Sequence, residues 1–100
     1  RHDDIMTLGD INIRVIETPG HTQGSVCYYI DNSVFTGDTL FQGSIGRFDM
    51  PGGDGRQLIQ SIITRLITLP TDTKVYPGHG NESTIAREKL TNPFLIRGIA

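Results

Sequence analysis

Three short turns, each containing glycine and each following an apolar run, constrain the fold of this chain more than any other feature. Each turn holds one potential metal ligand: His21 in residues 18–25, Asp38 in residues 36–39 and His79 in residues 77–80. Glycine lets a backbone take positive φ angles or approach a neighbour closely, and a side chain at a strand end is held by a rigid sheet. We therefore predict that the three side chains converge at one edge of a sheet.

The segments that precede these turns have the patterns of β-strands. Residues 11–15 alternate apolar and polar side chains, and residues 5–8 are the expected other arm of a hairpin. Residues 25–30, 33–36 and 74–76 are rich in β-branched and aromatic side chains, which also favours strands. Together these segments predict a sheet that delivers the chain to each of the three turns.

Two further segments have helical features. Apolar residues at positions 58, 59, 62, 63 and 66 recur at helical spacing, with Asp54 as the expected N-cap and Pro70 as the stop. A second helix is expected from residue 83 or 84 to about residue 91, where an Asn-Pro pair ends it. Residues 39–55 are expected to form an ordered loop. This order of segments predicts an α/β (α+β) fold in which helices flank a mixed sheet.

Composition and charge exclude several classes of partner. A length of 100 residues suits one small domain. The net charge of −2 and the absence of a basic cluster argue against binding to nucleic acid, and no apolar run has the length of a membrane span. The single cysteine, Cys27, lies in an expected strand and is interpreted as a core residue. Since it has no partner for an internal disulfide, we expect a reducing, cytoplasmic location.

The candidate ligands also have plainer interpretations, which the residues alone leave open. A loop histidine such as His21 is often a surface residue, and an aspartate after glycine, such as Asp38, often forms a turn with its own backbone. Two histidines and a carboxylate suit zinc, iron or manganese. Three protein ligands and a water molecule are also the composition of many catalytic zinc sites.

The three turns and two linking segments resemble the later motifs of the metallo-β-lactamase superfamily, and most closely its glyoxalase II-like hydrolases. The matching segments are Thr18–Ser25, Phe35–Phe41, Gly43–Arg47, Tyr76–Gly80 and Thr91–Leu95. They occur in the expected order and span about residues 10–96. The combination of five ordered motifs is much more specific than any one of them.

The resemblance implies a role for each candidate ligand. It assigns His21 to a first metal ion and His79 to a second, and it makes Asp38 the catalytic carboxylate that bridges the two. The implied cofactors are two divalent metal ions, for which we expect zinc, with iron or manganese as alternatives. In this family a hydroxide held between the metals attacks a substrate carbonyl, because bound dications lower the pKa of water and polarise the carbonyl.

One motif of the family has no counterpart here. The family carries His-x-His-x-Asp-His on an earlier segment, and nothing in residues 1–100 matches it. The chain thus resembles the C-terminal half of an αββα sandwich, a partial domain over residues 1–100. We expect the chain alone to bind metal weakly and to be inactive, with the remaining ligands supplied by a missing N-terminal half.

The implied function is metal-dependent hydrolysis of thioesters or related acyl compounds, similar to that of hydroxyacylglutathione hydrolases. One alternative is an iron oxidoreductase similar to persulfide dioxygenases. The third turn of those enzymes resembles Pro-Ala-His, whereas this chain has Pro77-Gly78-His79. A second alternative is an inactive fragment that only associates with itself. The expected partner in the first two cases is a small molecule.

Arg47 is the candidate substrate-binding residue. The family often has a basic residue in this loop that contacts the anionic part of the substrate, and arginine can bind a carboxylate with two hydrogen bonds. The alternative is a surface ion pair with Asp49 or Asp54, which would be common and weak.

A half-sandwich also predicts how the chain assembles. One sheet face would lack its partner layer, and it should carry part of an apolar set, since alternate strand residues share a side. The set is Ile11, Ile13, Val15, Val26, Tyr28, Ile30, Val34 and Val75. Because proteins rarely leave large apolar patches exposed, we expect a homo-oligomer or association with the missing N-terminal half.

Overall fold

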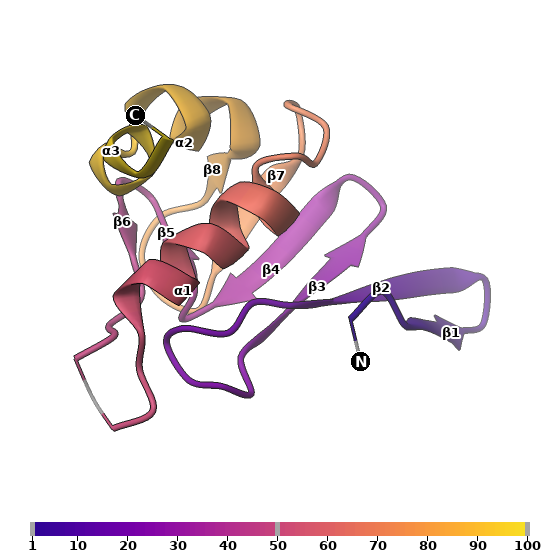
Figure 1. The fold of residues 1–100 in the computed structure, drawn as a ribbon. Helices are drawn as coiled ribbons and strands as arrows, with labels where there is room; N and C mark the ends of the chain where they lie inside the picture. The colour runs from indigo at the N-terminus through magenta and orange to yellow at the C-terminus, as the bar shows by residue number, and fades with distance from the viewer. Residues whose placement is uncertain (1, 50, 100) are drawn as a thin grey trace.

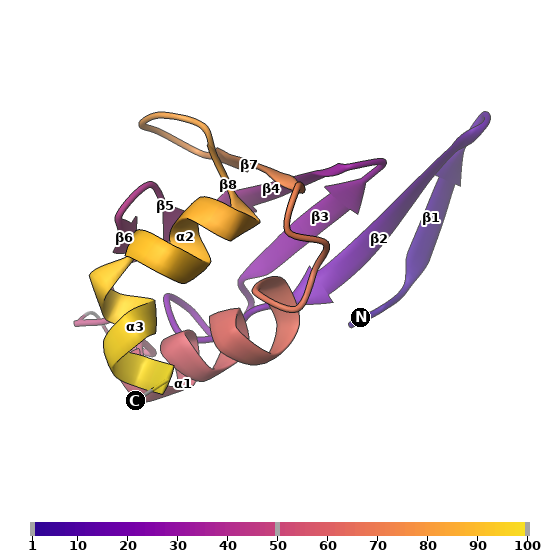
Figure 2. The ribbon, with the colours of Figure 1, turned by 90° about the horizontal axis from the view of Figure 1, so that it is seen from above.

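The computed structural model describes the backbone of residues 2–49 and 51–99 and contains one large mixed sheet with helices on one face (Figures 1 and 2). The strand order is β1-β2-β3-β4-β7-β8. Only β4 and β7 pair in parallel, and the other neighbours are antiparallel. The strands are β1 Ile5–Leu8, β2 Ile11–Glu17, β3 Val26–Ile30, β4 Ser33–Gly37, β7 Lys74–Pro77 and β8 Ser83–Thr84. The predicted mixed sheet with flanking helices is therefore confirmed.

The connection from β4 to β7 contains a small hairpin and the first helix. Strands β5 Leu40–Phe41 and β6 Ser44–Ile45 pair with each other, within the segment that the sequence predicts as a loop. Helix α1 Gly55–Ser61 follows and continues as a π-helical turn, η1 Ile62–Leu66. The predicted N-cap is confirmed, because the Asp54 carboxylate accepts a hydrogen bond from the Gln57 amide at 3.0 Å.

The C-terminal part forms two helices where the sequence predicts one. Helix α2 Ile85–Thr91 begins at Thr84, whose hydroxyl accepts a hydrogen bond from the Arg87 amide. The chain leaves the helix at Asn92, as expected before proline, but α3 Pro93–Ile99 then begins at once. Proline suits the first turn of a helix because its fixed φ is helical and its missing N–H needs no partner there. The sequence reasoning treated this proline only as a stop.

The hydrophobic core lies between the sheet and the helices. Alternate residues of the central strands belong to it, including Ile16, Cys27 and Val34, and apolar residues of α1 and η1 complete it. The fully buried apolar residues of the helices are Leu58, Ile62, Leu66, Ile85 and Leu95. Among the described residues no helix is long and apolar enough to cross a membrane.

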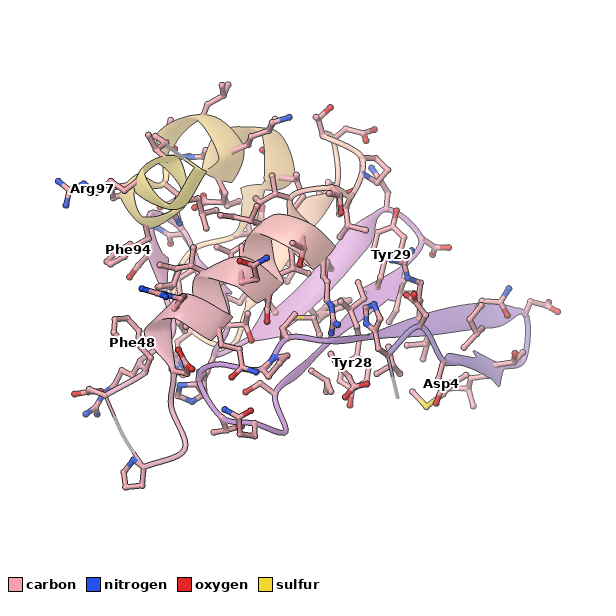
Figure 3. The ribbon with its side chains drawn as sticks, in the orientation of Figure 1. Asp4, Tyr28, Tyr29, Phe48, Phe94 and Arg97 are labelled. Carbon is pink, nitrogen blue, oxygen red and sulfur yellow. The ribbon has the colours of Figure 1, made fainter. Side chains whose placement is uncertain are left out.

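The opposite face of the sheet carries an apolar surface that none of the described helices covers. Tyr28 and Tyr29 are adjacent in β3 and point to opposite faces (Figure 3). Tyr28 pairs with Phe35 of β4, and both side chains are about 40% exposed. A shallow cavity on this face is lined by Met6, Ile13, Tyr28, Ile30 and Phe35.

Two residues of the predicted apolar set do not lie on this face. Val34 and Val75 are fully buried under the helices rather than on the open face. The reason is register: Val34 pairs with Tyr29 and Val75, so these three side chains share the covered face.

Burial of Cys27 leads to a testable pH dependence. Removal from water raises the pKa of the Cys27 thiol, although its hydrogen bonds, first with Thr18, act in the opposite direction. The unfolded state therefore loses this proton at a lower pH than the folded state does. Stability should fall by up to about 1.4 kcal/mol per pH unit once the pH passes about 8.5, until the raised pKa is reached.

The measurement is urea unfolding of the wild-type protein and of Cys27→Ala between pH 7 and pH 10. The variant should lose less stability over this range than the wild type. If the free energy of unfolding falls equally with pH in the two proteins, Cys27 does not contribute to the loss of stability at alkaline pH.

Candidate metal centre

The sheet topology explains why the three turns meet. Strand β2 is antiparallel to β3, β3 is antiparallel to β4, and β4 is parallel to β7. Strands β2, β4 and β7 therefore run in the same direction, and their carboxyl ends lie at the same edge. His21 follows β2, Asp38 follows β4 and His79 follows β7. The structure thus brings the three predicted side chains to one place, while their role as metal ligands stays a prediction.

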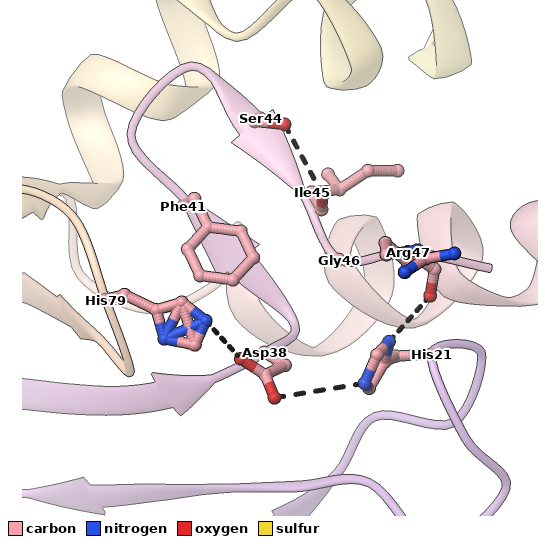
Figure 4. A pocket seen from close by; sticks show the side chains of 8 residues that line it. All are labelled: His21, Asp38, Phe41, Ser44, Ile45, Gly46, Arg47 and His79. Atoms are coloured by element: carbon pink, nitrogen blue, oxygen red, sulfur yellow. Dashed lines mark hydrogen bonds and ion pairs between the residues drawn. The ribbon is translucent and has the colours of Figure 1, made fainter.

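Asp38 lies between the two histidines and faces each with a different oxygen (Figure 4). Its Oδ2 is 3.9 Å from His21 Nε2, and its Oδ1 is 3.3 Å from His79 Nε2. The Asp38 side chain is 47% exposed and that of His79 is 74% exposed, whereas that of His21 is 23% exposed. The arrangement is therefore open to solvent on the His79 side.

The His21 ring is held in a defined orientation. Its Nδ1 lies 2.6 Å from the backbone carbonyl oxygen of Arg47 (Figure 4). A carbonyl oxygen can only accept a hydrogen bond, so Nδ1 carries a hydrogen and donates it to Arg47. Nε2, which faces Asp38 Oδ2 at 3.9 Å, is then the ring nitrogen that would bind a metal ion, in the orientation that a metal-binding histidine needs.

Buried hydroxyl groups connect the first two turns beneath these ligands. The Thr18 hydroxyl lies 3.2 Å from the Thr39 hydroxyl and 3.4 Å from the Cys27 sulfur, and Thr18 and Thr39 are buried. The Thr36 hydroxyl donates to the Leu40 carbonyl at 2.7 Å. These contacts fix the bases of the His21 and Asp38 turns relative to each other.

The cavity above the ligands has a volume of about 340 Å³. Its lining residues are His21, Asp38, Phe41, Ser44, Ile45, Gly46, Arg47 and His79. The Phe41 ring lies beside the His79 ring, with 5.6 Å between the ring centroids. The β5–β6 hairpin therefore forms one wall of the cavity and the three turns form its floor.

The three side chains suit two metal ions, each held by one pair of ligands, rather than one metal ion held by all three. Two ligands that each lie about 2.0–2.2 Å from one metal ion are about 3–3.5 Å apart, so the contact between His79 and Asp38 matches and that between His21 and Asp38 requires a small closure. Within residues 2–49 and 51–97, no group of three or more His, Cys, Asp or Glu side chains could hold a metal ion. The geometry therefore suits one histidine and one Asp38 oxygen per metal ion, with further ligands from elsewhere.

The structure shows the plainer of the two interpretations of Arg47 that the sequence left open. Its guanidinium group binds the Asp49 carboxylate at 3.2 and 3.4 Å, and this hydrogen bond is the main reason why the pKa of Asp49 is lowered. Both side chains are more than 65% exposed, so the pair is the weak surface contact of the plainer interpretation. Asp54, the other partner considered, caps α1 instead. Substrate binding by Arg47 remains a prediction.

Sequence reasoning missed the β5–β6 hairpin and its effect on His21. The available signal was the two-residue connection Gln42-Gly43 between two short apolar segments, because glycine at the second position is typical of tight hairpin turns. Gly43 has a φ of +73°. The hydrogen bond from His21 uses a backbone oxygen of Arg47, which no side-chain pattern can reveal.

Comparison with known proteins assigns the family. The model of the metallo-beta-lactamase superfamily matches residues 2–79. The chain is 45% identical over 94 residues to a hydroxyacylglutathione hydrolase, GloC, of Haemophilus influenzae, covering 92% of this chain and 44% of that protein. It is also similar to the crystal structure of ETHE1 from Myxococcus xanthus, with a TM-score of 0.89, 42% identity and coverage of 93% of this chain and 43% of the other.

A third similar structure is TTHA1623 in a di-iron-bound form, with a TM-score of 0.81, 46% identity and coverage of 90% of this chain and 45% of the other. The chain spans less than half the length of curated relatives that it matches, 45% of one and 46% of another. The match of the family model over most of the chain shows that it belongs to the metallo-beta-lactamase superfamily.

Proposed function

We propose that the full-length protein containing this chain is a metal-dependent hydrolase of thioesters or related acyl compounds. The observation that carries the proposal is Asp38, whose two oxygens face two different histidines, as suits a carboxylate shared by two metal ions. The similarity to a hydroxyacylglutathione hydrolase supports the class of substrate. The protein would then be a cytoplasmic thioesterase with a small-molecule substrate.

His21, Asp38 and His79 would hold the ions, for which we propose zinc. Bound dications of this kind polarise a carbonyl group and lower the pKa of water. The residues of this chain have two further tasks in the proposal. The Arg47 carbonyl keeps His21 oriented, and the Arg47 guanidinium can exchange its exposed contact with Asp49 for an anionic group of the substrate.

The test is a panel of acyl thioesters assayed with the full-length protein after loading with zinc. We expect hydrolysis of S-acyl glutathione compounds, including hydroxyacyl ones, and loss of that activity after treatment with a chelator. Two bound zinc ions without hydrolysis of any thioester would contradict the proposed substrate class. The 100-residue chain alone should show no activity, because it provides only one histidine and one carboxylate oxygen for each ion.

An iron oxidoreductase is a second candidate, and the similarity to a structure in a di-iron-bound form supports iron as the metal. The metal content of the purified protein and its oxygen consumption with a persulfide distinguish the two. Iron as the main metal, together with oxygen consumption and no thioester hydrolysis, would favour the oxidoreductase over the hydrolase.

The open apolar face of the sheet leads to a prediction about assembly. Covering it should stabilise association by about 2.5 kcal/mol for every 100 Å² of apolar surface removed from water. We therefore expect the isolated chain to form a dimer or a higher oligomer through the face that carries Tyr28 and Phe35, in place of the remainder of the full-length protein. Sedimentation equilibrium at low micromolar concentration measures this, and a well-folded monomer of 11.0 kDa would contradict it.

A further inference from the structure

Glu88 is a fully buried carboxylate outside the candidate metal centre. Its Oε1 accepts hydrogen bonds from the Gly43 amide at 2.9 Å and from Asn92 Nδ2 at 2.8 Å, and its Oε2 accepts one from the Ser83 hydroxyl at 2.5 Å. Burying a carboxylate is unfavourable unless its oxygens are paired in this way. The position of Glu88 is therefore closely coupled to that of Gly43, at the turn of the β5–β6 hairpin.

Asn92 holds the same turn at a second point. Its Nδ2 also donates to the Ser44 carbonyl oxygen at 3.1 Å, and Asn92 is itself fully buried. Two side chains at the end of α2 thus bind the N–H of Gly43 and the carbonyl of Ser44. This contact joins residues 43–47 to residues 91–95, the two linking segments of the family resemblance.

The segment fixed in this way touches each of the three candidate ligands. The Phe41 ring lies beside His79. The backbone at Gly46 passes so close to Asp38 that a Cβ atom there would come within 1.8 Å of the Asp38 carbonyl oxygen. A hydrogen bond of 2.9 Å from the Gly46 amide to the Thr39 carbonyl oxygen also holds this backbone next to Asp38.

The third contact is the Arg47 carbonyl oxygen, which orients His21. Arg47 lies only four residues after Gly43, at the end of the same short hairpin. A shift of the turn would therefore move this carbonyl oxygen and release the His21 ring. In metal sites generally, such outer partners of a histidine set its orientation and the affinity for the metal.

We propose that Glu88, together with Asn92, is a positioning residue for the metal centre. It fixes the β5–β6 hairpin, and through the Arg47 carbonyl it fixes the orientation of His21. The inference rests on the proposed role of His21 as a metal ligand, but not on the substrate. It assigns the role to the position of Oε1 rather than to the charge of Glu88.

Substitution of Glu88 by glutamine or by aspartate distinguishes the effect of the position of Oε1 from the effect of the charge. In Glu88→Gln the amide oxygen can stay on Gly43 and Asn92, because its Nε2 can face the Ser83 hydroxyl, which is able to accept a hydrogen bond. Glu88→Asp keeps the charge but is one methylene shorter, so it withdraws the oxygen from Gly43. Glu88→Ala removes both features. Leu66→Ala is the matched control, because Leu66 is equally buried but does not line the cavity.

The experiment measures the dissociation constant of zinc by competition with a chromophoric chelator, and the visible spectrum of the cobalt-loaded form, for the full-length protein and these variants. We expect Glu88→Ala and Glu88→Asp to bind zinc about 10–100-fold more weakly and to change the cobalt spectrum. Glu88→Gln and Leu66→Ala should stay within about threefold of the wild type and keep its spectrum. If Glu88→Ala does not fold, the comparison of the Gln and Asp variants decides.

Tighter binding by Glu88→Asp than by Glu88→Gln would overturn the proposal, as would wild-type affinity in Glu88→Ala or an equal loss in Leu66→Ala. A wild-type protein that binds no metal would overturn both this inference and the proposed function. Variants with the expected order of zinc affinities, in a protein that hydrolyses no thioester, would support the inference while contradicting the proposed function.

Discussion

Replacing Asp38 by alanine should lower kcat of the full-length protein by at least about 100-fold, more than the 10–100-fold typical of residues around a metal site. The reason is that Asp38 lies between the two histidines and faces each of them with a different oxygen. Its loss would remove a ligand from each proposed metal ion at once. Michaelis–Menten kinetics and the measured content of metal per protein should both show the effect.

Arg47→Ala is the comparison for this variant. The Arg47 side chain is exposed and already has a partner in Asp49, so its loss should mainly raise KM, by about tenfold. Its backbone carbonyl, which holds His21, remains in the variant. A larger fall of kcat in Arg47→Ala than in Asp38→Ala would contradict both assigned roles.

Replacing Gly46 by alanine should destabilise the protein by at least about 3 kcal/mol, the upper part of the range for overpacked sites. The added Cβ atom would lie 1.8 Å from the Asp38 carbonyl oxygen and 3.4 Å from the His21 Cβ atom. The first of these atoms belongs to the backbone and cannot rotate away. The hairpin would have to move off Asp38, so zinc affinity should fall as well.

Gly24→Ala is the matched control for Gly46→Ala. Gly24 belongs to the His21 turn, but no heavy atom lies within 4 Å of a Cβ atom added there. Guanidinium unfolding should give this variant a stability within about 0.5 kcal/mol of the wild type. A Gly46→Ala variant as stable as Gly24→Ala would show that the hairpin does not pack closely against Asp38 in solution.

The features that the sequence predicted are those encoded by local rules. The convergence of His21, Asp38 and His79 follows from three ligand-bearing turns at the ends of strands that run in one direction. The start of α1 follows from Asp54 as an N-cap, and the core position of Cys27 follows from its place in β3. The last two depend on a residue and its near neighbours in the chain, whereas the convergence also depends on the pairing of β2, β3, β4 and β7.

The features that the sequence did not predict depend on contacts between distant segments. Glu88 and Asn92 bind a turn more than 40 residues earlier in the chain, and nothing in their own helix indicates that contact. The faces of Val34 and Val75 depend on strand register, in which a shift of one residue exchanges the two sides of a sheet. Helix α3 was missed because proline ends one helix and begins the next at the same place.

The most direct test of the metal centre is anomalous X-ray diffraction from crystals of the full-length protein loaded with zinc. We expect two anomalous peaks, one next to His21 Nε2 and Asp38 Oδ2 and the other next to His79 Nε2 and Asp38 Oδ1. The absence of a peak at Asp38, or a single peak that leaves one of the two histidines without metal, would contradict the shared-carboxylate centre.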